Sequence, residues 1–459
     1  MSFMLKKGDV IEVIVPTFAL PDCVGVIRHQ NWVVFVPGVL PGEKCRVTIR
    51  KVKRNFLQGE LEEFIEKSPA RIEPICPHFK MGCGGCSLQF ADYAEQVSIK
   101  EKNALNAIEK IGKVDLSSID YEGFLPSVLS LGYRNKMEFN FGNQDGKLIC
   151  GLRPKGKYWD LIDLQTCYLM NSQLVTGLLD FFRSYGNRYG LKGYDPVRKD
   201  GFLRNLLIRY NRSLDQYLIG LSTIRGELPG VGELVKDLTH YFPNVSGLVH
   251  IINNSLANAL LFEEKILLYG SDYYIETIGS TQYKVSVDSF FQVNIHTGEL
   301  LFPIITNYAD LQPGESLFDL YSGNGSIGLY LSRQGTMITG IEENPQAVED
   351  AQYNATLNSI SSYNAICGRV EKALLDVIGN SMKKGIVDPP RAGLTPKVIK
   401  TLIAAHPEKI VYVSCNTASL ARDLAVFAED NYFLKKISWI DLFPQTPHYE
   451  AVALIEPSS

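Results

Sequence analysis

The stretch from Asp319 to Glu342 constrains the fold more than any other, because it reads as a strand, a glycine-rich turn, a helix and a second strand. The apolar run SLFDLY is typical of a buried parallel strand, and SGNGSIG leads into a helix that begins near Ile327. Glycines in this turn let the backbone approach a ligand closely. The next strand, TMITGIE, ends in Glu342, an acid placed to bind two ribose hydroxyls. The pattern predicts a nucleoside-cofactor site.

The region 286–459 alternates strand-like and helix-like segments. The expected strands are SLFDLY, TMITGIE, NAICGRV, GIVDPP, KIVYVSC, FLKKISWIDLF and YEAVALIEP, and PQAVEDAQYNATLN is the clearest connecting helix. This alternation predicts an α/β domain with a doubly wound, Rossmann-like sheet. Ligands of such a sheet bind beyond the carboxyl ends of its strands.

Composition indicates an ordinary globular protein of two to four domains, with 459 residues, 45% hydrophobic and 21% charged. The start MSFMLKKGDV lacks the apolar core of a signal peptide, and no run approaches a membrane span, so we expect a cytoplasmic protein. There, the nine cysteines are better explained as reduced, metal-bound or catalytic than as disulfides. The net charge of −4 argues against indiscriminate polyanion binding but leaves room for a local basic stripe.

Residues 1–68 alternate like a small β-barrel, in the runs GDVIEVIV, GVIRHQNWVVFV, EKCRVTIRKVKR and LQGELEEFI. The third run is strongly basic, which by itself describes a solvated strand face as well as a nucleic-acid surface. Its cationic residues are Lys44, Arg46, Arg50, Lys51, Lys53 and Arg54. The pattern VFVPGVLPGEKCRV resembles the TRAM domain, an oligonucleotide-binding barrel of RNA-modifying enzymes. That resemblance favours RNA binding.

A cysteine-rich segment, CPHFKMGCGGCSLQF, follows the barrel. Cys76, Cys83 and Cys86 lie on a glycine-rich backbone and can face one soft metal centre. Cys167 is the best candidate for a fourth ligand. Four thiolates suit either zinc or an iron–sulfur cluster.

The central region, 69–285, is predicted to be mostly antiparallel β structure. It contains many short β-like runs from 120 onward, including YRNKMEFNFG, FLRNLLIRY and QYLIGLST. An amphipathic helix at about 93–112 precedes them, and we expect it to pack on the C-terminal domain.

Six polar or reactive residues are predicted near the ligand-binding edge of the C-terminal sheet. They are Gln292, Tyr321, Glu342, Asp388, Cys415 and Glu450. A lone cysteine at a strand end is usually inert, but this one is predicted to lie near a nucleoside site and a downstream carboxylate. Cys415 would attack an electron-poor double bond as a thiolate. Glu450, in a partly dry pocket, would have a raised pKa and could accept a proton.

The motifs FFQVN, DLYSGNGSIGL, GIEENPQAVEDAQYNA, DPPRAGL, YVSCNTASLARDL and HYEAVALIE together resemble the RNA 5-methyluridine methyltransferases, in particular the ribosomal RNA branch. The resemblance spans essentially the full chain and implies S-adenosylmethionine as cofactor and uracil in RNA as substrate. It implies that Cys415 is the nucleophile and Glu450 the proton acceptor, and that the other four edge residues bind the cofactor. It also implies a 4Fe-4S cluster on Cys76, Cys83, Cys86 and Cys167. Six residues separate Cys76 from Cys83, one more than expected.

The implied chemistry explains why these groups occur together. Addition of the Cys415 thiolate at carbon 6 of uracil makes carbon 5 nucleophilic enough to take a methyl group, and Glu450 then removes the carbon 5 proton. The base must be flipped out of the RNA to reach such a pocket, and Phe290 and Phe291 are candidates for stacking on it, although core positions suit both better. Because the barrel and the cysteines are both present, we expect large-subunit ribosomal RNA as substrate and a monomeric enzyme without membrane contact.

Several other functions fit parts of the sequence. A tRNA uracil-5-methyltransferase would share the catalytic motifs, but the tRNA-directed branch generally lacks the barrel and the cysteine cluster. An NAD-dependent oxidoreductase would use the same glycine turn, and a non-catalytic RNA-binding factor would keep the barrel and a metal-stapled loop. A radical S-adenosylmethionine enzyme is disfavoured by the cysteine spacing.

Overall fold

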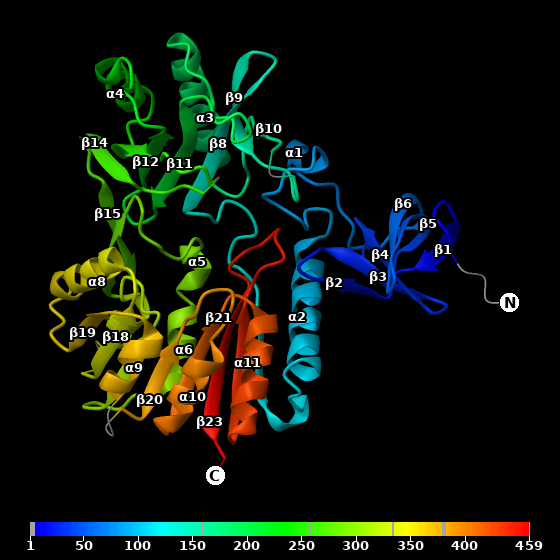
Figure 1. The fold of residues 1–459 in the computed structure, drawn as a ribbon, viewed down its shortest axis with the longest axis vertical. Coiled ribbons are helices and arrows are strands. Elements are labelled where there is room, and N and C mark those ends of the chain that lie inside the picture. The colour runs from blue at the N-terminus through cyan, green and yellow to red at the C-terminus, as the bar shows by residue number, and fades with distance from the viewer. Residues whose placement is uncertain (1–4, 158, 258, 333–334, 379–381, 459) are drawn as a thin grey trace.

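The computed structural model describes residues 5–157, 159–257, 259–332, 335–378 and 382–458. Three regions follow one another along the chain (Figure 1). A six-stranded β domain lies to one side, a central region lies above, and a large α/β sheet lies below. None of the helices in the described ranges is long and apolar enough to cross a membrane.

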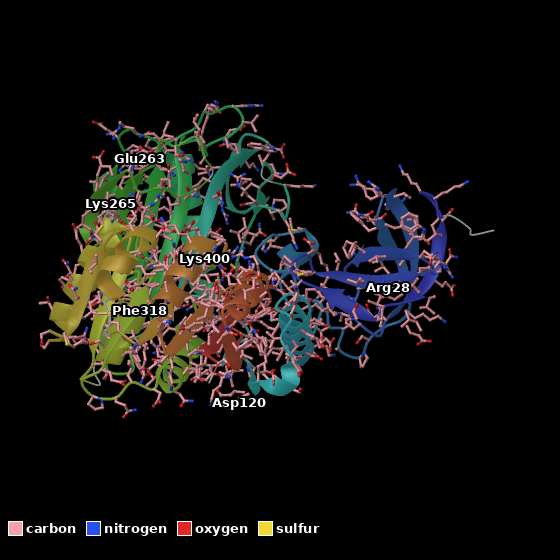
Figure 2. The ribbon with its side chains drawn as sticks, turned by 60° about the horizontal axis from the view of Figure 1, so that its bottom comes forward. Arg28, Asp120, Glu263, Lys265, Phe318 and Lys400 are labelled. Atoms are coloured by element: carbon pink, nitrogen blue, oxygen red, sulfur yellow. The ribbon has the colours of Figure 1, made fainter. Side chains whose placement is uncertain are left out.

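The N-terminal β domain has the strand order β1-β5-β6-β4-β3-β2. Its strands are β1 (Val10–Ile14), β2 (Thr17–Ala19), β3 (Val24–His29), β4 (Trp32–Pro37), β5 (Lys44–Val52) and β6 (Leu57–Glu66). Inward residues such as Val34, Val36 and Val47 are fully buried, as strand alternation requires. The basic run lies on β5 and just beyond it, and Arg46 forms ion pairs with Glu12 and Glu63, so part of its charge is neutralised. Figure 2 shows Arg28 on this domain, apart from the sheet that carries Phe318.

The central region is built on a seven-stranded sheet of order β10-β9-β8-β11-β12-β13-β14, antiparallel except between β12 and β13. Its strands are β8 (Lys136–Gln144), β9 (Lys147–Leu152), β10 (Ile162–Asp163), β11 (Leu203–Asn211), β12 (Gln216–Thr223), β13 (Val245–Ile252) and β14 (Glu264–Gly270). A separate hairpin consists of β15 (Tyr273–Ile278) and β16 (Thr281–Ser286). The helices are α1 (Pro77–Lys80), α2 (Tyr93–Lys110), α3 (Ser172–Arg188) and α4 (Val231–Tyr241), with a 3-10 turn at Leu116–Ser118. The prediction of a mostly antiparallel β region is confirmed.

The C-terminal sheet has eight strands in the order β19-β18-β17-β20-β21-β23-β22-β7. Its strands are β7 (Asp120–Leu125), β17 (Ser316–Leu320), β18 (Met337–Glu342), β19 (Tyr363–Cys367), β20 (Lys384–Val387), β21 (Lys409–Ser414), β22 (Tyr432–Ile440) and β23 (Glu450–Pro457). Its helices are α5 (Ile295–Gly298), α6 (Leu301–Ala309), α7 (Ser326–Ser332), α8 (Pro345–Leu357), α9 (Val370–Ile378), α10 (Pro396–Ala404) and α11 (Thr417–Glu429). Strands β19, β18, β17, β20 and β21 are parallel, so the predicted doubly wound sheet is confirmed.

One strand lies elsewhere than its sequence position suggested. The segment Asp120–Leu125, which we placed with the central sheet, pairs in parallel with β22 as the edge strand of the C-terminal sheet. Its aromatic residues explain the choice, because Phe124 packs on Tyr449 and Tyr121 packs edge-on against Trp439. The C-terminal sheet thus includes a strand from the middle of the chain.

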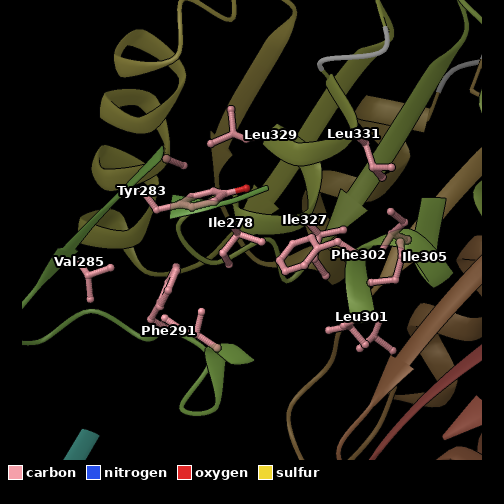
Figure 3. Close-up of a cluster of buried hydrophobic side chains, with 14 of the residues drawn as sticks. Ile278, Tyr283, Val285, Phe291, Leu301, Phe302, Ile305, Ile327, Leu329 and Leu331 are labelled. Atoms are coloured by element: carbon pink, nitrogen blue, oxygen red, sulfur yellow. The ribbon is translucent and has the colours of Figure 1, made fainter. Parts of the chain in front are cut away.

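Two buried cores fix the C-terminal sheet, one on each face. Figure 3 shows part of one core, where Phe291 points toward Tyr283 and Ile327 lies near Phe302. On the opposite face, Ala104 and Ile108 of α2 join the other core, four residues apart on one side of that helix. Helix α2 therefore packs on the C-terminal domain against α11.

Candidate active site

Cys415 and Glu450 lie opposite each other at the ends of two neighbouring strands of the C-terminal sheet, β21 and β23. Cys415 directly follows β21, in the turn that leads into α11. Ser414 of β21 pairs with Ala451 of the antiparallel neighbour β23, and the next step of that register sets Glu450 across from Cys415. Glu450 is 5% exposed and Cys415 is half-buried. A thiol and a carboxyl group therefore lie close together in a partly buried site.

The electrostatics around Cys415 favour the neutral thiol in the free protein. Its pKa is raised to about 11, first by burial and then by the Glu450 and Asp388 carboxylates, while the Arg391 guanidinium opposes the rise. Burial also raises the pKa of Glu450 well above its ordinary value, with Asp388 contributing. A protonated Glu450 has no charge to solvate, and its deprotonated form is a strong base in this setting.

Two further acids, Asp388 and Asp319, lie near the same ends of the strands. Asp388 follows β20, and its backbone N–H donates to the Leu320 carbonyl oxygen at 3.2 Å. Burial raises the pKa of Asp388 to about 7. Asp319, inside β17, is 1% exposed, and its pKa rises to about 8 through burial and then through the charge of Asp388. Sequence reasoning assigned Asp319 no role, and an acid within the otherwise apolar run SLFDLY was the available signal.

The glycine turn after β17 has the shape of a ligand cradle. Glu342 accepts a hydrogen bond from the Gly323 N–H at 3.1 Å, so the carboxylate and the turn are held together. Gly323 has φ of +54°, and a β-carbon there would meet nothing within 4 Å. At Gly328, a β-carbon would lie 2.6 Å from Tyr363, which leaves no room for a larger residue. Gly323 therefore faces open space, while Gly328 packs the helix against the sheet.

Two further predicted cofactor residues are Tyr321, next to this turn, and Gln292, which precedes α5. Tyr321 begins the turn with φ of +62° and is half-buried against the core that contains α11. Gln292 lies between β16 and α5, and its carbonyl oxygen accepts a hydrogen bond from the Asn135 side chain at 2.8 Å. Just before it, Phe291 is buried whereas Phe290 is 74% exposed. Only Phe291 is a core residue, so the core assignment was wrong for Phe290.

Residues 441–449 form a loop that leads into Glu450 and is held by an ion pair and several hydrogen bonds. Asp441 and Lys100 of α2 form an ion pair at 2.7 Å, and both side chains are fully buried. The Tyr93 hydroxyl donates to the other oxygen of Asp441 at 3.1 Å. Breaking a buried pair by removing one partner is strongly destabilising, so α2 holds one end of this loop firmly.

Gln445, in the same loop, connects α2 and the cysteine segment. Its backbone N–H donates to the Gln96 side chain at 2.9 Å, and the Gln96 amide donates back to the Gln445 side chain at 2.9 Å. The Gln445 carbonyl oxygen accepts from the N–H groups of Ser87 at 2.7 Å and Leu88 at 3.1 Å. The position of the cysteine segment is thereby coupled to the loop that carries Glu450.

The four predicted metal-ligating cysteines line one small cavity of about 20 Å³. Cys76 and Cys167 are buried, and Cys83 and Cys86 are half-buried. The pKa of Cys86 is raised to about 12, chiefly by burial and to a smaller degree by the other three thiols, while a hydrogen bond from Gln89 opposes the rise. Within the described ranges, no three His, Cys, Asp or Glu side chains converge closely enough to hold a single metal ion.

A second cavity, of about 910 Å³, joins all three regions of the molecule, and we call it the basic cavity. Five cationic side chains line it against two carboxylates. They are Arg134, Lys136, Arg153, Lys155 and Arg391, with Asp22 and Glu138. Its remaining wall includes Ser87 of the cysteine segment and His448, two residues before Glu450. Burial and the surrounding cations lower the pKa of His448 to about 4, so this imidazole is neutral at pH 7.

Comparisons with known proteins agree with this architecture. A family model described as tRNA (Uracil-5-)-methyltransferase matches residues 249–457, and a TRAM domain model matches residues 5–61. An uncharacterized RNA methyltransferase of Caldanaerobacter subterraneus subsp. tengcongensis is 35% identical over 99% of this chain and 100% of its own length. Another, from Halalkalibacterium halodurans, is 32% identical over 98% of both chains.

A solved structure covers nearly the whole fold. It is the Pyrococcus abyssi tRNA (uracil-54, C5)-methyltransferase in complex with S-adenosyl-L-homocysteine, which matches with a TM-score of 0.76 and 25% identity over 97% of this chain and 100% of that chain. The family models, the relatives and this structure agree with one another and with the resemblance in the motifs. This chain belongs to the RNA (uracil-5-)-methyltransferase family and carries a TRAM domain at its N-terminal end.

Proposed function

We propose that this protein methylates carbon 5 of a uridine in large-subunit ribosomal RNA, using S-adenosylmethionine and a covalent bond between Cys415 and the uracil ring. The observation that supports this most is the register of β21 and β23, which sets Cys415 against Glu450. A covalent pyrimidine mechanism needs a sulfur and a proton acceptor at the same ring.

The residues around the glycine turn fit S-adenosylmethionine. Gly323 presents open space to a ligand, and the Glu342 carboxylate beside it can accept hydrogen bonds from ribose hydroxyls. The charge of Asp388 raises the pKa of Asp319, in the strand before this turn, and also that of Cys415. When bound, the cofactor supplies an electrophilic methyl group on a sulfonium. The matching cofactor product in the Pyrococcus abyssi complex supports the same choice.

The reaction runs through steps that the chain's own residues perform. Cys415 must first give its proton to solvent, a loss that the Arg391 charge favours and the neighbouring carboxylates oppose, while Glu450 stays deprotonated. Its thiolate adds to carbon 6, the ring's electrons move to carbon 5, and carbon 5 bonds to the methyl group. Glu450 then accepts the proton from carbon 5, and the ring electrons expel the thiolate as the double bond re-forms. The products are 5-methyluridine and the demethylated cofactor.

RNA reaches this site through the basic cavity. Five cations suit phosphate groups, and Arg391 and His448 connect the cavity to the catalytic residues. Because the TRAM domain supplies Pro21 and Asp22 to the same cavity, RNA bound there touches all three regions. The exposed ring of Phe290 is a candidate for stacking on a base near the flipped uridine.

We infer that the four cysteines lining this cavity would hold a 4Fe-4S cluster, because their donor set is four thiolates. Each iron of such a cluster takes one thiolate, so its four ligands stand further apart than the ligands of one zinc ion. The walls are mostly apolar, and the Gln89 side-chain amide donates to Cys86 Sγ at 3.2 Å, a hydrogen bond that would support a thiolate ligand. A cluster here would be structural, because it would fix the segment whose Ser87 and Leu88 bind the Gln445 loop.

Transfer of a labelled methyl group tests this function and separates its two RNA candidates. Purified protein is incubated with labelled S-adenosylmethionine and either ribosomal RNA or tRNA from a strain lacking the gene. We expect 5-methyluridine at a position of the large ribosomal RNA. Label in tRNA instead would make this a tRNA enzyme, as the name of its Pyrococcus abyssi neighbour suggests for that protein. Binding of both RNAs without methyl transfer would leave only an RNA-binding factor.

A further inference from the structure

A wide groove on the central region has no part in the function described so far. Its volume is about 1140 Å³, and we call it the outer groove. It is formed by the ends of β8 and β9, residues 153–155, 157 and 159–161, the start of β10 and the loop 192–201, with Met81 and Gly82 of the cysteine segment at one side. All of these residues lie outside the ranges 5–61 and 249–457 that the two family models match.

Large apolar side chains stand exposed in this groove. Trp159 is 65% exposed, Val197 63% and Met81 61%, and all three line it. Tryptophan is rarely left so open, because burying its ring is strongly favourable. By contrast, Trp439 is fully buried in the C-terminal sheet. An exposed indole beside two other apolar groups offers a stacking surface.

Cations surround that surface. The groove is lined by Arg153, Lys155, Lys157, Lys192 and Arg198, and by the carboxylates Asp145, Asp160, Asp195 and Asp200. Two of these acids have other roles. Asp195 accepts hydrogen bonds from the backbone N–H groups of Val197 and Arg198 and so builds its own turn. Asp160 forms a long ion pair with Lys157 at 3.8 Å, in which both side chains are largely exposed. Aromatic and cationic groups in one groove are the combination that binds single-stranded nucleic acid.

The outer groove adjoins the basic cavity, whose lining residue Arg391 acts electrostatically on Cys415. Arg153 and Lys155 line both, so only the segment between them separates the two hollows. That segment is fixed in place, because the Gly84 N–H donates to the Arg153 carbonyl oxygen at 3.0 Å and the Lys155 ammonium donates to the Asp22 carbonyl oxygen at 3.0 Å. A chain lying in the basic cavity can therefore continue over a rigid ridge into the outer groove.

We propose that the outer groove binds the single-stranded RNA that adjoins the target uridine, with the ring of Trp159 stacked on one of its bases. This inference rests on the proposed function for the identity of its ligand. Lys192 and Arg198 would contact the phosphates on either side of that base. The groove would lengthen the recognised RNA beyond what the catalytic region reaches and would thereby contribute to the choice of site.

Tryptophan fluorescence tests the stacking directly. In a Trp32→Phe background, Trp159 is the exposed indole and Trp439 remains buried. A 20-nucleotide oligouridylate should quench this emission as it binds, and the additional change Trp159→Phe should remove the quenching. Unchanged emission at RNA concentrations that saturate binding, measured by anisotropy of labelled oligouridylate, would overturn the proposal.

Affinity for two lengths of RNA tests the position of the groove. Trp159→Ala should weaken binding of the 20-nucleotide oligouridylate about tenfold, whereas Trp159→Phe should retain most of the affinity. Binding of a 5-nucleotide oligouridylate, which fits within the basic cavity, should be unchanged in both variants. Equal losses of affinity for both RNA lengths would contradict the proposal. So would no loss of affinity for either length, a result that would favour a protein as the occupant of the outer groove.

These outcomes are independent of methyl transfer. If the 20-nucleotide RNA binds through Trp159 but the protein methylates no RNA, the proposed function fails and the groove assignment stands. If methylation is normal and Trp159→Ala changes neither fluorescence nor affinity, the groove assignment alone fails.

Discussion

Cysteines occur in two contrasting settings in this protein, and the contrast separates chemistry from architecture. Cys415 stands alone at a strand end, half-buried, with two carboxylates and one guanidinium acting on it. Cys76, Cys83, Cys86 and Cys167 line an apolar cavity together, where burial is the main influence on Cys86 and the other three thiols are a smaller one. Charged neighbours control when a thiol becomes a nucleophile, whereas neighbouring thiols and an apolar wall suit metal ligation.

The two settings are nevertheless physically linked. The cysteine segment binds Gln445 through two backbone N–H groups, and the Gln445 loop ends at Glu450. A change in the cysteine cavity can therefore displace Glu450 without touching Cys415. The comparison predicts that variants at Cys415 lose chemistry alone, while variants in the cavity lose structure and then chemistry.

Cys415→Ala should have the largest effect on turnover. Removing the nucleophile of a covalent mechanism should lower kcat by about 10⁴-fold or more, while cofactor affinity and iron content stay unchanged. Methyl-transfer assays, equilibrium dialysis and iron analysis measure these three quantities. Cys367→Ala, at the exposed end of β19, is the matched control and should be fully active. Residual activity of Cys415→Ala within tenfold of the native enzyme would exclude the covalent route.

Glu450→Gln should stop the reaction at a later stage. Because the glutamine cannot accept the carbon 5 proton, turnover should fall about 10²- to 10⁴-fold and a methylated RNA–protein adduct should accumulate. Denaturing gels with labelled cofactor detect that adduct. Glu456→Gln, further along the same strand, should accumulate none. Normal turnover by Glu450→Gln would assign the proton to another base.

Cys86→Ser should separate the two cysteine settings most clearly. Iron content should drop from about four atoms per chain to near zero, and the brown colour should be lost. Thermal stability should fall because the loop loses its metal staple, whereas Cys150→Ser, a buried cysteine outside the cavity, should keep its iron. A colourless, zinc-containing native protein prepared without oxygen would refute the cluster.

The charges around Cys415 predict opposite shifts in its reactivity. Above pH 7 Asp388 is ionised and raises the pKa of Cys415, so Asp388→Asn should lower that pKa and speed alkylation of Cys415 by iodoacetamide about threefold at pH 9. Removing the opposing cation in Arg391→Gln should slow it by a similar factor. Mass spectrometry of the Cys415 peptide gives both rates. Shifts in the same direction for both variants would contradict this charge arrangement.

Gln445→Ala should have the smallest effect. The Gln445 side chain would no longer accept from the Gln96 amide or donate to the Ser130 carbonyl oxygen, which costs on the order of 1–3 kcal/mol, but its backbone hydrogen bond to Gln96 and the ion pair of Asp441 with Lys100 would still anchor the loop. We expect kcat to fall about fivefold with unchanged KM for the cofactor. Gln352→Ala on the exposed side of α8 is the control. A change confined to cofactor KM would show that Gln445 does not act through Glu450.

Much of the fold could be predicted because its signals are local. The glycine turn, the buried strands of the C-terminal sheet and the alternating barrel strands are all visible within short windows of sequence. The position of β7 was not predictable in this way, because strand pairing with β22 depends on aromatic contacts made across more than 300 residues of sequence.

The site shows the same division between local and distant information. Strand order places Cys415 and Glu450 at one edge, so their meeting could be expected from the sequence. Asp319 was missed because it lies in an apolar run, and its burial beside Asp388 is a tertiary property. Phe290 and Phe291 looked alike in sequence, and only the packed core distinguishes them. The cavities that surround the site come from three separate regions and had no sequence signal.

The central claim is that sulfur at position 415 bonds to carbon 6 of a uracil. RNA containing 5-fluorouridine tests it most directly. Its carbon 5 carries fluorine in place of the hydrogen that the base removes, so the adduct should persist. With cofactor present, we predict a stable complex whose mass equals protein plus methylated RNA, and peptide mapping should place the link on Cys415. If methyl transfer to native RNA proceeds while no complex forms with the fluorinated RNA, or if the link maps to another residue, this account is contradicted.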